Sequence, residues 1–138
     1  NSKAERNIQS IQVGGTVLLE RASAPISMWS FAAEHYCYNR ARKKTVRDTG
    51  KTAYELKWGH AFVGELYVFG CYASYLVKAP ERDKFESRSR DGILIGYGKL
   101  GSARILDTDE FKDGRIKIVQ SRNFQADRQR FPFAEIPK

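Results

Sequence analysis

The sequence is poor in cysteine and histidine, which limits the sites that it can build. Only Cys37 and Cys71 are cysteines and only His35 and His60 are histidines. They form neither a CxxC pair nor a dense Cys/His cluster, so a structural zinc site is not expected. Each cysteine stands beside aromatic residues, which predicts buried free thiols rather than a disulfide. Free thiols indicate a reducing compartment, the nucleus or the cytoplasm.

Long apolar runs, internal repeats and low-complexity tracts are also absent. Without an apolar run long enough to cross a bilayer, no membrane partner is expected. The chain has 138 residues, of which 41% are hydrophobic and 29% charged. These values are typical of a globular protein with one ordinary domain or two small units.

Negative charge is the scarcer sign. Sixteen Asp and Glu stand against 24 Lys and Arg, giving a net charge of +8 and an isoelectric point near 9.6. This balance favours a polyanionic partner such as nucleic acid, with simple solubility as the alternative.

The hydrophobic periodicity changes along the chain, from helical up to Gly59 to strand-like from Leu66. We therefore predict an α+β fold with a boundary near Val63-Gly64. Helices would occupy residues 1–63, a small antiparallel β-barrel of four to five strands residues 64–126, and an irregular tail residues 127–138.

Three helices are predicted in the first part. Apolar positions from residue 4 to 22 recur at three and four, with Gly14-Gly15 as either a kink or a place of close approach. The second helix begins at Pro25 or Ser27 and extends to Arg40. A third opens on a capping box from Thr52 to Glu55 and ends at Gly59.

Short strands separated by turns are predicted in the second part, over residues 66–77, 92–97, 102–106 and 115–124. The continuous apolar run Ile93-Leu94-Ile95 indicates a central strand. Gly70 and Gly96 lie inside predicted strands, where bulges or corners are expected.

Five segments of the sequence carry recognisable motifs: Asn1-Ser2-Lys3-Ala4-Glu5-Arg6, the segment from Pro25 to Arg40, Gly50-Lys51-Thr52-Ala53-Tyr54-Glu55, Leu66-Tyr67-Val68-Phe69-Gly70-Cys71, and the stretch from Lys84 to Tyr97. In this order they resemble the motifs of copia-type retrotransposon polyproteins. The similarity extends from residue 1 to about 125. Ser2 and Ala53 depart from the family pattern.

The resemblance implies the end of a ribonuclease H-like integrase core followed by a Src-homology-3-like small barrel. Glu5 would be the third carboxylate of the integrase triad, whose two aspartates lie upstream in the family. In the intact enzyme three carboxylates hold two Mg²⁺ or Mn²⁺ ions for phosphoryl transfer. One carboxylate cannot assemble such a site, so this chain by itself should be neither an enzyme nor a holder of a cofactor. Without the resemblance, Glu5 would be an ordinary carboxylate favoured by the helix dipole.

Basic side chains are the candidates for contacts with DNA or another nucleic acid. The first group is a pair beside Glu5, Lys3 and Arg6. The second is a run after the second helix, interpreted as a loop: Arg40, Arg42, Lys43, Lys44 and Arg47. The third is a loop between barrel strands: Arg82, Lys84, Arg88 and Arg90. The alternative for the second group is a solvated loop, and for the third a contact with a neighbouring subunit, such as integrase self-association.

The other conspicuous side chains are given structural roles. Asp107, Asp109 and Asp113 are assigned to turns. The aromatic residues of the strands, together with Trp29 and Trp58, are expected to be core and packing residues.

Two functions remain open from the sequence. The first is a non-catalytic integrase fragment that binds nucleic acid. The second is a decayed or host-reused protein-interaction module with no DNA role. A gene-model fragment without a role of its own is a third possibility.

Overall fold

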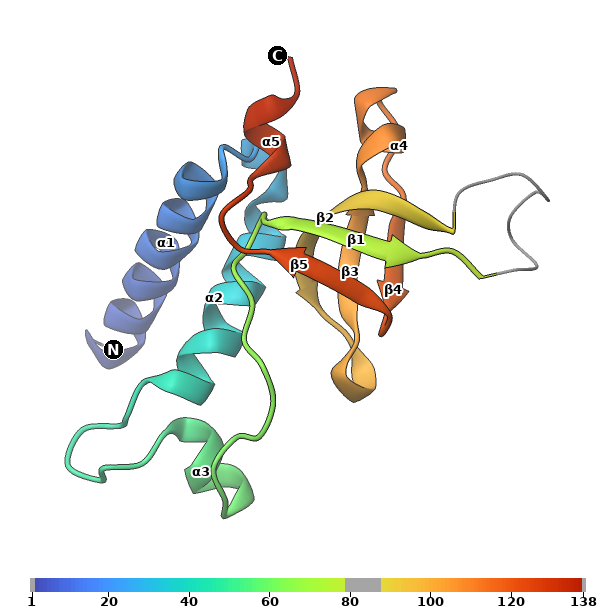
Figure 1. Cartoon of the computed structure of the whole chain (residues 1–138). Coiled ribbons are helices and arrows are strands. Elements are labelled where there is room, and N and C mark those ends of the chain that lie inside the picture. The colour runs from blue at the N-terminus through green and yellow to red at the C-terminus, as the bar shows by residue number, and fades with distance from the viewer. Residues whose placement is uncertain (1, 79–87, 138) are drawn as a thin grey trace.

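The computed structural model describes residues 2–78 and 88–137, which form a group of helices beside an antiparallel sheet (Figure 1). The helices are α1 (Ser2–Ala22), η1 (Ile26–Met28), α2 (Trp29–Lys43), α3 (Ala53–Trp58), η3 (Lys99–Gly101), α4 (Thr108–Lys112) and α5 (Pro132–Glu135). The strands are β1 (Tyr72–Leu76), β2 (Ser89–Tyr97), β3 (Ala103–Asp107), β4 (Ile118–Ser121) and β5 (Phe124–Asp127). The α+β class is confirmed.

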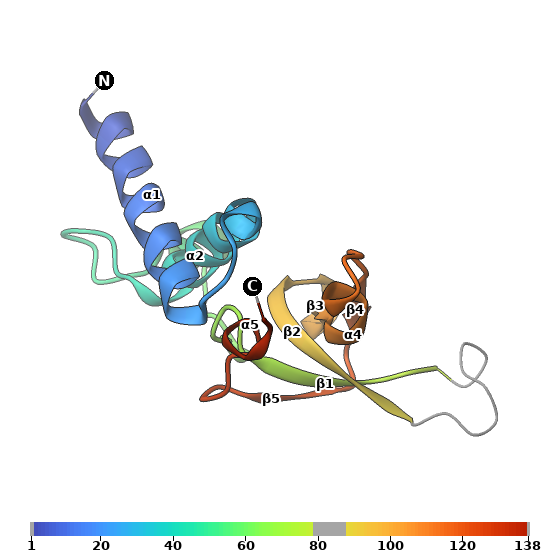
Figure 2. The same cartoon turned by 90° about the horizontal axis from the view of Figure 1, so that it is seen from above.

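Helix α1 is one continuous helix that passes through Gly14-Gly15. A Cβ at Gly14 would overlap the ring of Tyr36 on α2, so the glycines mark a close approach between the helices. Only the second half of α1 is packed, through Gly15, Leu19 and Ala22. The predicted apolar face is not packed in the first two turns, where Ala4 and Ile8 are exposed, whereas Ile11 is half-buried. The N-terminal end of α1 projects away from the sheet in both views (Figures 1 and 2).

The capping box at α3 is confirmed. The Thr52 hydroxyl accepts a hydrogen bond from the Glu55 amide at 3.1 Å, and the Glu55 carboxylate accepts one from the Thr52 amide at 3.3 Å. Gly59 ends the helix with a φ of 82°, a left-handed conformation that glycine adopts without strain.

The strand order is β4-β3-β2-β1-β5, with every neighbouring pair antiparallel. Ile93, Leu94 and Ile95 on β2 are fully buried, which confirms the predicted central strand. The register between β2 and β3 shifts at Leu94–Gly96, as expected for a bulge at Gly96. The sheet is not closed, because β4 and β5 are its two edges, so a closed barrel is not observed.

Several predicted strand boundaries are wrong. The first strand is confined to β1, because the chain turns at Gly70, where φ is 80°. Residues 115–124 divide into β4 and the start of β5, and the short helix α4 was not predicted. The tail is also not irregular throughout, since it contains α5 with Phe133 buried.

The core has two clusters, one on each face of β2. The first joins the helices to the sheet and includes Leu19, Met28, Ile93, Ile95 and Phe133. The second lies on the other face of the sheet around Cys71, Tyr75, Leu94 and Ile105. Residues from all three predicted parts of the chain therefore contribute to one packed body.

The packing of the cysteines and tryptophans was predicted only in part. Cys71 is buried, and burial raises the pKa of its thiol to about 11, whereas Cys37 is exposed. Both thiols are free. Trp58 is largely exposed and is not a packing anchor, and Trp29 is partly exposed beside Gly15. Among the described residues, no helix is both long and apolar enough to cross a membrane.

Candidate nucleic-acid interface

Glu5 lies in the first turn of α1 and is exposed, as are Lys3 and Arg6. The Arg6 guanidinium donates a hydrogen bond to the Ser2 carbonyl oxygen at 3.3 Å. Within the described ranges, no three His, Cys, Asp or Glu side chains come together in an arrangement that could hold a metal ion. A lone exposed carboxylate does not fit Mg²⁺ or Mn²⁺, which require several oxygen ligands, so Glu5 by itself supports no chemical step.

The basic run after Tyr38 is mostly helical, contrary to the predicted loop. Arg40, Arg42 and Lys43 form the last turn of α2, where cations are favoured by the helix dipole. Lys44 follows as the C-cap. Arg40 is half-buried and its guanidinium carbon lies 6.0 Å from the centre of the Tyr36 ring.

Arg42 is half-buried, and its guanidinium group lies among aromatic rings. Its guanidinium carbon lies 3.4 Å from the centre of the Tyr38 ring and 5.2 Å from those of Tyr54 and Phe62. It also donates to the Tyr38 carbonyl oxygen at 3.1 Å. Cation–π contacts of this kind contribute about 0.5–2 kcal/mol. Arg42 therefore links α2 to the segment around α3, and its role as a phosphate contact stays a prediction.

The chain after α2 forms a small hairpin, residues 43–52. Thr45 and Thr52 form an antiparallel bridge, and the Val46 amide donates to the Lys51 carbonyl oxygen at 2.7 Å. Asp48 and Gly50 both have a φ of 66°, which allows the reversal between the two arms. The hairpin is thus held by its own backbone and extends into solvent (Figure 1).

Four exposed cations are brought together on this hairpin: Lys43, Lys44, Arg47 and Lys51. Arg47 lies 4.0 Å from Asp48, but the two side chains are 95% and 91% exposed, so this ion pair contributes little. Lys51 was not among the predicted contacts, although its place across a short turn from Arg47 was visible in the sequence. We call this set the hairpin cations.

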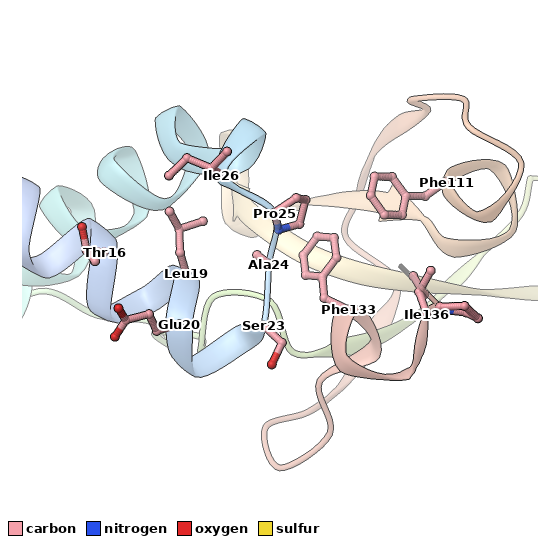
Figure 3. A pocket seen from close by; sticks show the side chains of 11 residues that line it. Thr16, Leu19, Glu20, Ser23, Ala24, Pro25, Ile26, Phe111, Phe133 and Ile136 are labelled. Carbon is pink, nitrogen blue, oxygen red and sulfur yellow. The ribbon is translucent and has the colours of Figure 1, made fainter.

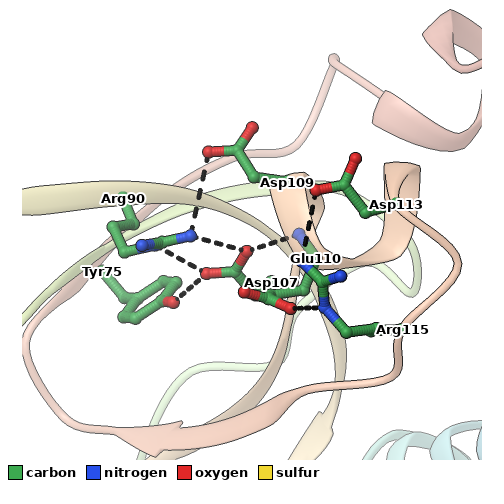
Figure 4. Close-up of polar contacts among 7 residues, drawn as sticks. All are labelled: Tyr75, Arg90, Asp107, Asp109, Glu110, Asp113 and Arg115. Atoms are coloured by element: carbon green, nitrogen blue, oxygen red, sulfur yellow. Dashed lines mark hydrogen bonds and ion pairs between the residues drawn. The ribbon is translucent and has the colours of Figure 1, made fainter.

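The third predicted group is divided. Arg82 and Lys84 lie outside the described residues. Arg88 is exposed, and its carbonyl oxygen accepts a hydrogen bond from the Val77 amide at 2.8 Å. Arg90 instead points toward Asp107 (Figure 4).

Asp107 is fully buried, and four donors surround its carboxylate. Arg90 donates from Nε at 2.8 Å and from Nη2 at 3.1 Å, the Glu110 amide donates at 3.0 Å, and the Tyr75 hydroxyl donates to Oδ2. Burial alone would raise the pKa of Asp107, but the hydrogen bonds from Arg90, Tyr75 and the Glu110 amide hold it below its ordinary value. Asp107 is therefore the last residue of β3 and the N-cap of α4 rather than a solvated turn residue. Arg90 is committed to it and is a poor candidate for phosphate.

A polar joint connects α2 to the sheet at the backbone of Tyr67. The Tyr67 carbonyl oxygen accepts hydrogen bonds from His35 Nε2 at 2.7 Å and from Asn39 at 3.2 Å, while its amide donates to the Tyr97 hydroxyl at 2.6 Å. That hydroxyl donates to Asn39 Oδ1 at 2.6 Å. Burial lowers the pKa of His35, opposed by its hydrogen bond to Tyr67, and raises the pKa of Tyr97 to about 12. The joint fixes the direction in which α2 and its hairpin leave the sheet.

Comparisons of the chain with protein-family models, with curated proteins and with solved structures find no match. The fold and the site define an α+β protein with exposed cations on a hairpin anchored through α2.

Proposed function

We propose that this chain is a non-catalytic, nucleic-acid-binding part of a copia-type retrotransposon integrase. The observation that carries the proposal is the set of hairpin cations, which are exposed and held on a backbone-bonded turn. Such a surface suits phosphate contacts that position a duplex without reading its sequence. The free thiols fit action in the nucleus or cytoplasm.

We propose that this open sheet corresponds to the Src-homology-3-like unit that the resemblance implies, although it is not closed into a barrel. Its strands follow a meander from β1 to β4, and β5 returns to pair with β1 at the opposite edge. β2 is the longest strand, with nine residues, and its bulge lets it bend between its two neighbours. Small β folds of this kind often contact nucleic acid or partner proteins through their loops.

The proposed lack of catalysis rests on the resemblance, in which Glu5 is one of three triad carboxylates and the two aspartates lie upstream. Glu5 would act only when the two upstream aspartates of the parent enzyme complete a site for Mg²⁺ or Mn²⁺. This chain should therefore bind DNA without cutting or joining it.

Salt dependence tests the proposal. The logarithm of the affinity for a DNA duplex should fall linearly with the logarithm of salt concentration, with a slope of about 0.9 for each phosphate contacted. The triple variant Lys43→Ala/Lys44→Ala/Arg47→Ala should reduce that slope by about 3, because each substitution removes one contact. Lys112→Ala, which removes an exposed lysine on α4, is the control and should leave the slope unchanged. Fluorescence anisotropy measures both; duplex binding that ignores salt would refute the proposal.

One observation favours the alternative, a protein-interaction module without a DNA role. An apolar groove of about 750 Å³ lies between the end of α1, α4 and α5, with Leu19, Phe111, Phe133 and Ile136 around it (Figure 3). Other exposed apolar side chains of α1 are Ile8, Val13 and Val17, of which Val13 and Val17 lie on a different side of the helix from Leu19. Such surfaces occur where proteins meet, including in self-association. The absence of duplex binding at low salt, together with concentration-dependent association in analytical ultracentrifugation, would favour this function.

A further inference from the structure

A second basic surface lies on the sheet, away from the hairpin cations. A hollow of about 490 Å³ is bordered by the end of β1, by β2, by η3 and by the β4–β5 turn. Its basic side chains are Lys78, Arg90, Lys99, Lys117 and Arg122. We call this hollow the basic groove.

No acidic side chain lines the basic groove within the described part of the chain. The nearby carboxylate of Asp107 is fully buried and is shared with Arg90, so it neutralises that one guanidinium. Lys78, Lys99, Lys117 and Arg122 are exposed, and no ion pair among the described residues involves them. Among the described residues the groove therefore presents an excess of positive charge from four separate segments, with the exposed Glu110 carboxylate as an electrostatic neighbour of Lys117.

The remaining polar side chains of the groove are neutral hydrogen-bonding groups. Gln120 and Asn123 supply side-chain amides, whereas the Ser102 and Ser121 hydroxyls already donate to the Lys99 and Asn123 carbonyl oxygens. Cations combined with amide groups match the oxygens of phosphodiesters, which accept hydrogen bonds and carry negative charge. The Tyr75 hydroxyl is already committed to Asp107 and is not available to a ligand.

The basic groove continues into a second hollow. This neighbour has a volume of about 560 Å³ and shares Tyr75, Leu76, Arg122 and Asn123 with it. It also lacks acidic side chains among the described residues. Two hollows that meet at Arg122 suit an extended polymer better than one small anion.

The shape of the groove selects the kind of nucleic acid. Hollows of this size are comparable to small-ligand pockets of about 300–1,000 Å³. A flexible single strand can enter hollows of this size. A rigid duplex is better suited to a projecting surface such as the hairpin of residues 43–52. Charged grooves that follow the backbone are the usual means of binding single strands without sequence preference.

We propose that the basic groove binds the phosphodiester backbone of single-stranded nucleic acid. The inference rests on the proposed function, since it assigns a second nucleic-acid surface to the same chain, with the duplex on the hairpin and a single strand on the sheet.

Two triple charge reversals test this division. Lys99→Glu/Lys117→Glu/Arg122→Glu alters the basic groove, and Lys43→Glu/Lys44→Glu/Arg47→Glu alters the hairpin with an identical change in net charge. Each variant is titrated in fluorescence anisotropy against an oligo-deoxythymidine of about 16 nucleotides and against a duplex of similar length. The groove variant should bind the single strand at least about tenfold more weakly, with a salt slope lower by about 2, and the duplex within about threefold of the wild type. The hairpin variant should show the reverse.

The outcomes separate the two proposals. Equal losses for both ligands in the groove variant, or an unchanged single-strand affinity, overturn the groove assignment. Failure of the hairpin variant to weaken duplex binding refutes the proposed duplex surface, while the single-strand titration still decides the groove. Displacement of the oligonucleotide by polyglutamate at equal charge concentration also overturns the groove assignment, because the groove would then bind any polyanion. If the groove variant does not fold by circular dichroism, Lys117→Gln/Arg122→Gln replaces it, with the same single-strand criterion.

Discussion

Asp107 concentrates the polar interactions of the sheet in one side chain. Its carboxylate is fully buried, and it joins Arg90 of β2, Tyr75 of β1 and the first turn of α4 (Figure 4). Removing one partner of a buried ion pair leaves the others without a counterpart, which is more costly than loss of an exposed pair.

We therefore predict that Asp107→Ala lowers the free energy of unfolding by about 3 kcal/mol. The Tyr75 hydroxyl, the Arg90 guanidinium and the Glu110 amide would all lose their acceptor. Urea denaturation measures the change. Asp109→Ala is the matched control, because Asp109 is 67% exposed and lies 3.9 Å from the same guanidinium. It should cost less than about 0.5 kcal/mol, and equal effects of the two variants would contradict the assigned role of Asp107.

At the scale of elements, the end of α1 packs against the turn that precedes β1. Gly70 has a φ of 80° and donates a hydrogen bond to the Leu94 carbonyl oxygen at 2.7 Å. A Cβ at this position would overlap the side chain of Ala22, which is fully buried. This turn therefore requires glycine both for its conformation and for the contact.

Gly70→Ala should accordingly destabilise the fold by about 2–4 kcal/mol, the sum of left-handed strain and overpacking. Gly59→Ala separates the two causes, since Gly59 has a φ of 82° with no neighbouring atom within 4 Å of an added Cβ. It should cost about 1–2 kcal/mol. Thermal or urea unfolding of both variants gives the difference between their losses in free energy of unfolding. Equal losses would show that Ala22 moves aside for the new methyl group at no cost.

The elements differ in how far the sequence could predict them. The capping box of α3 was predictable because all of its bonds lie within four residues. The N-cap bond of α4 is equally local, since Asp107 accepts from the Glu110 amide three residues later. The burial of Asp107 was not predictable, because Arg90 and Tyr75, which hold its carboxylate, precede it by 17 and 32 residues. A buried central strand was evident at Ile93–Ile95, whereas α5 depends on the pocket that Phe133 fills.

The candidate site shows the same dependence on distance along the chain. The positive charge after α2 was visible in the sequence, but the rings of Tyr54 and Phe62 that enclose Arg42 are separated from it by 12 and 20 positions. The basic groove was missed because its cations come from four segments, and only the order of the strands brings them together.

At the scale of the whole molecule, the joint at Tyr67 makes the helices and the sheet depend on one another. His35 and Asn39 of α2 bind the Tyr67 carbonyl oxygen, and Tyr97 of β2 closes the same network. The apolar cluster that includes Leu19, Met28 and Ile93 crosses the same interface. Helices and sheet should therefore unfold in a single transition.

Protonation of His35 should destabilise the folded state, because it places a charge on a buried ring, although Nε2 still donates to the Tyr67 carbonyl oxygen. The ring is buried between Phe69 and Tyr97, with centroids 5.6 and 4.8 Å away. The Tyr67 carbonyl accepts from Nε2, so the neutral tautomer carries its proton there, and Nδ1 has no partner among the described residues. Burial lowers the pKa of His35, so the unfolded chain binds a proton before the folded one does. The contribution of the neutral His35 ring to the free energy of unfolding is therefore fully present above the ordinary histidine pKa, near 6.5. It is lost as the pH falls from that value through the lower pKa of the folded state.

The predicted loss has a limiting slope of about 1.4 kcal/mol per pH unit, the value for one proton. Urea denaturation between about pH 8 and pH 5 measures it. His35→Gln keeps a donor for the Tyr67 carbonyl but cannot titrate, so this slope should disappear while the single transition remains. His60→Gln alters an exposed histidine outside the joint and should retain the wild-type profile. If His35→Gln keeps the wild-type dependence of stability on pH, a group other than His35 causes it. If the helices and the sheet of this variant unfold separately, the joint requires the geometry of the imidazole ring and not only a donor to the Tyr67 carbonyl oxygen.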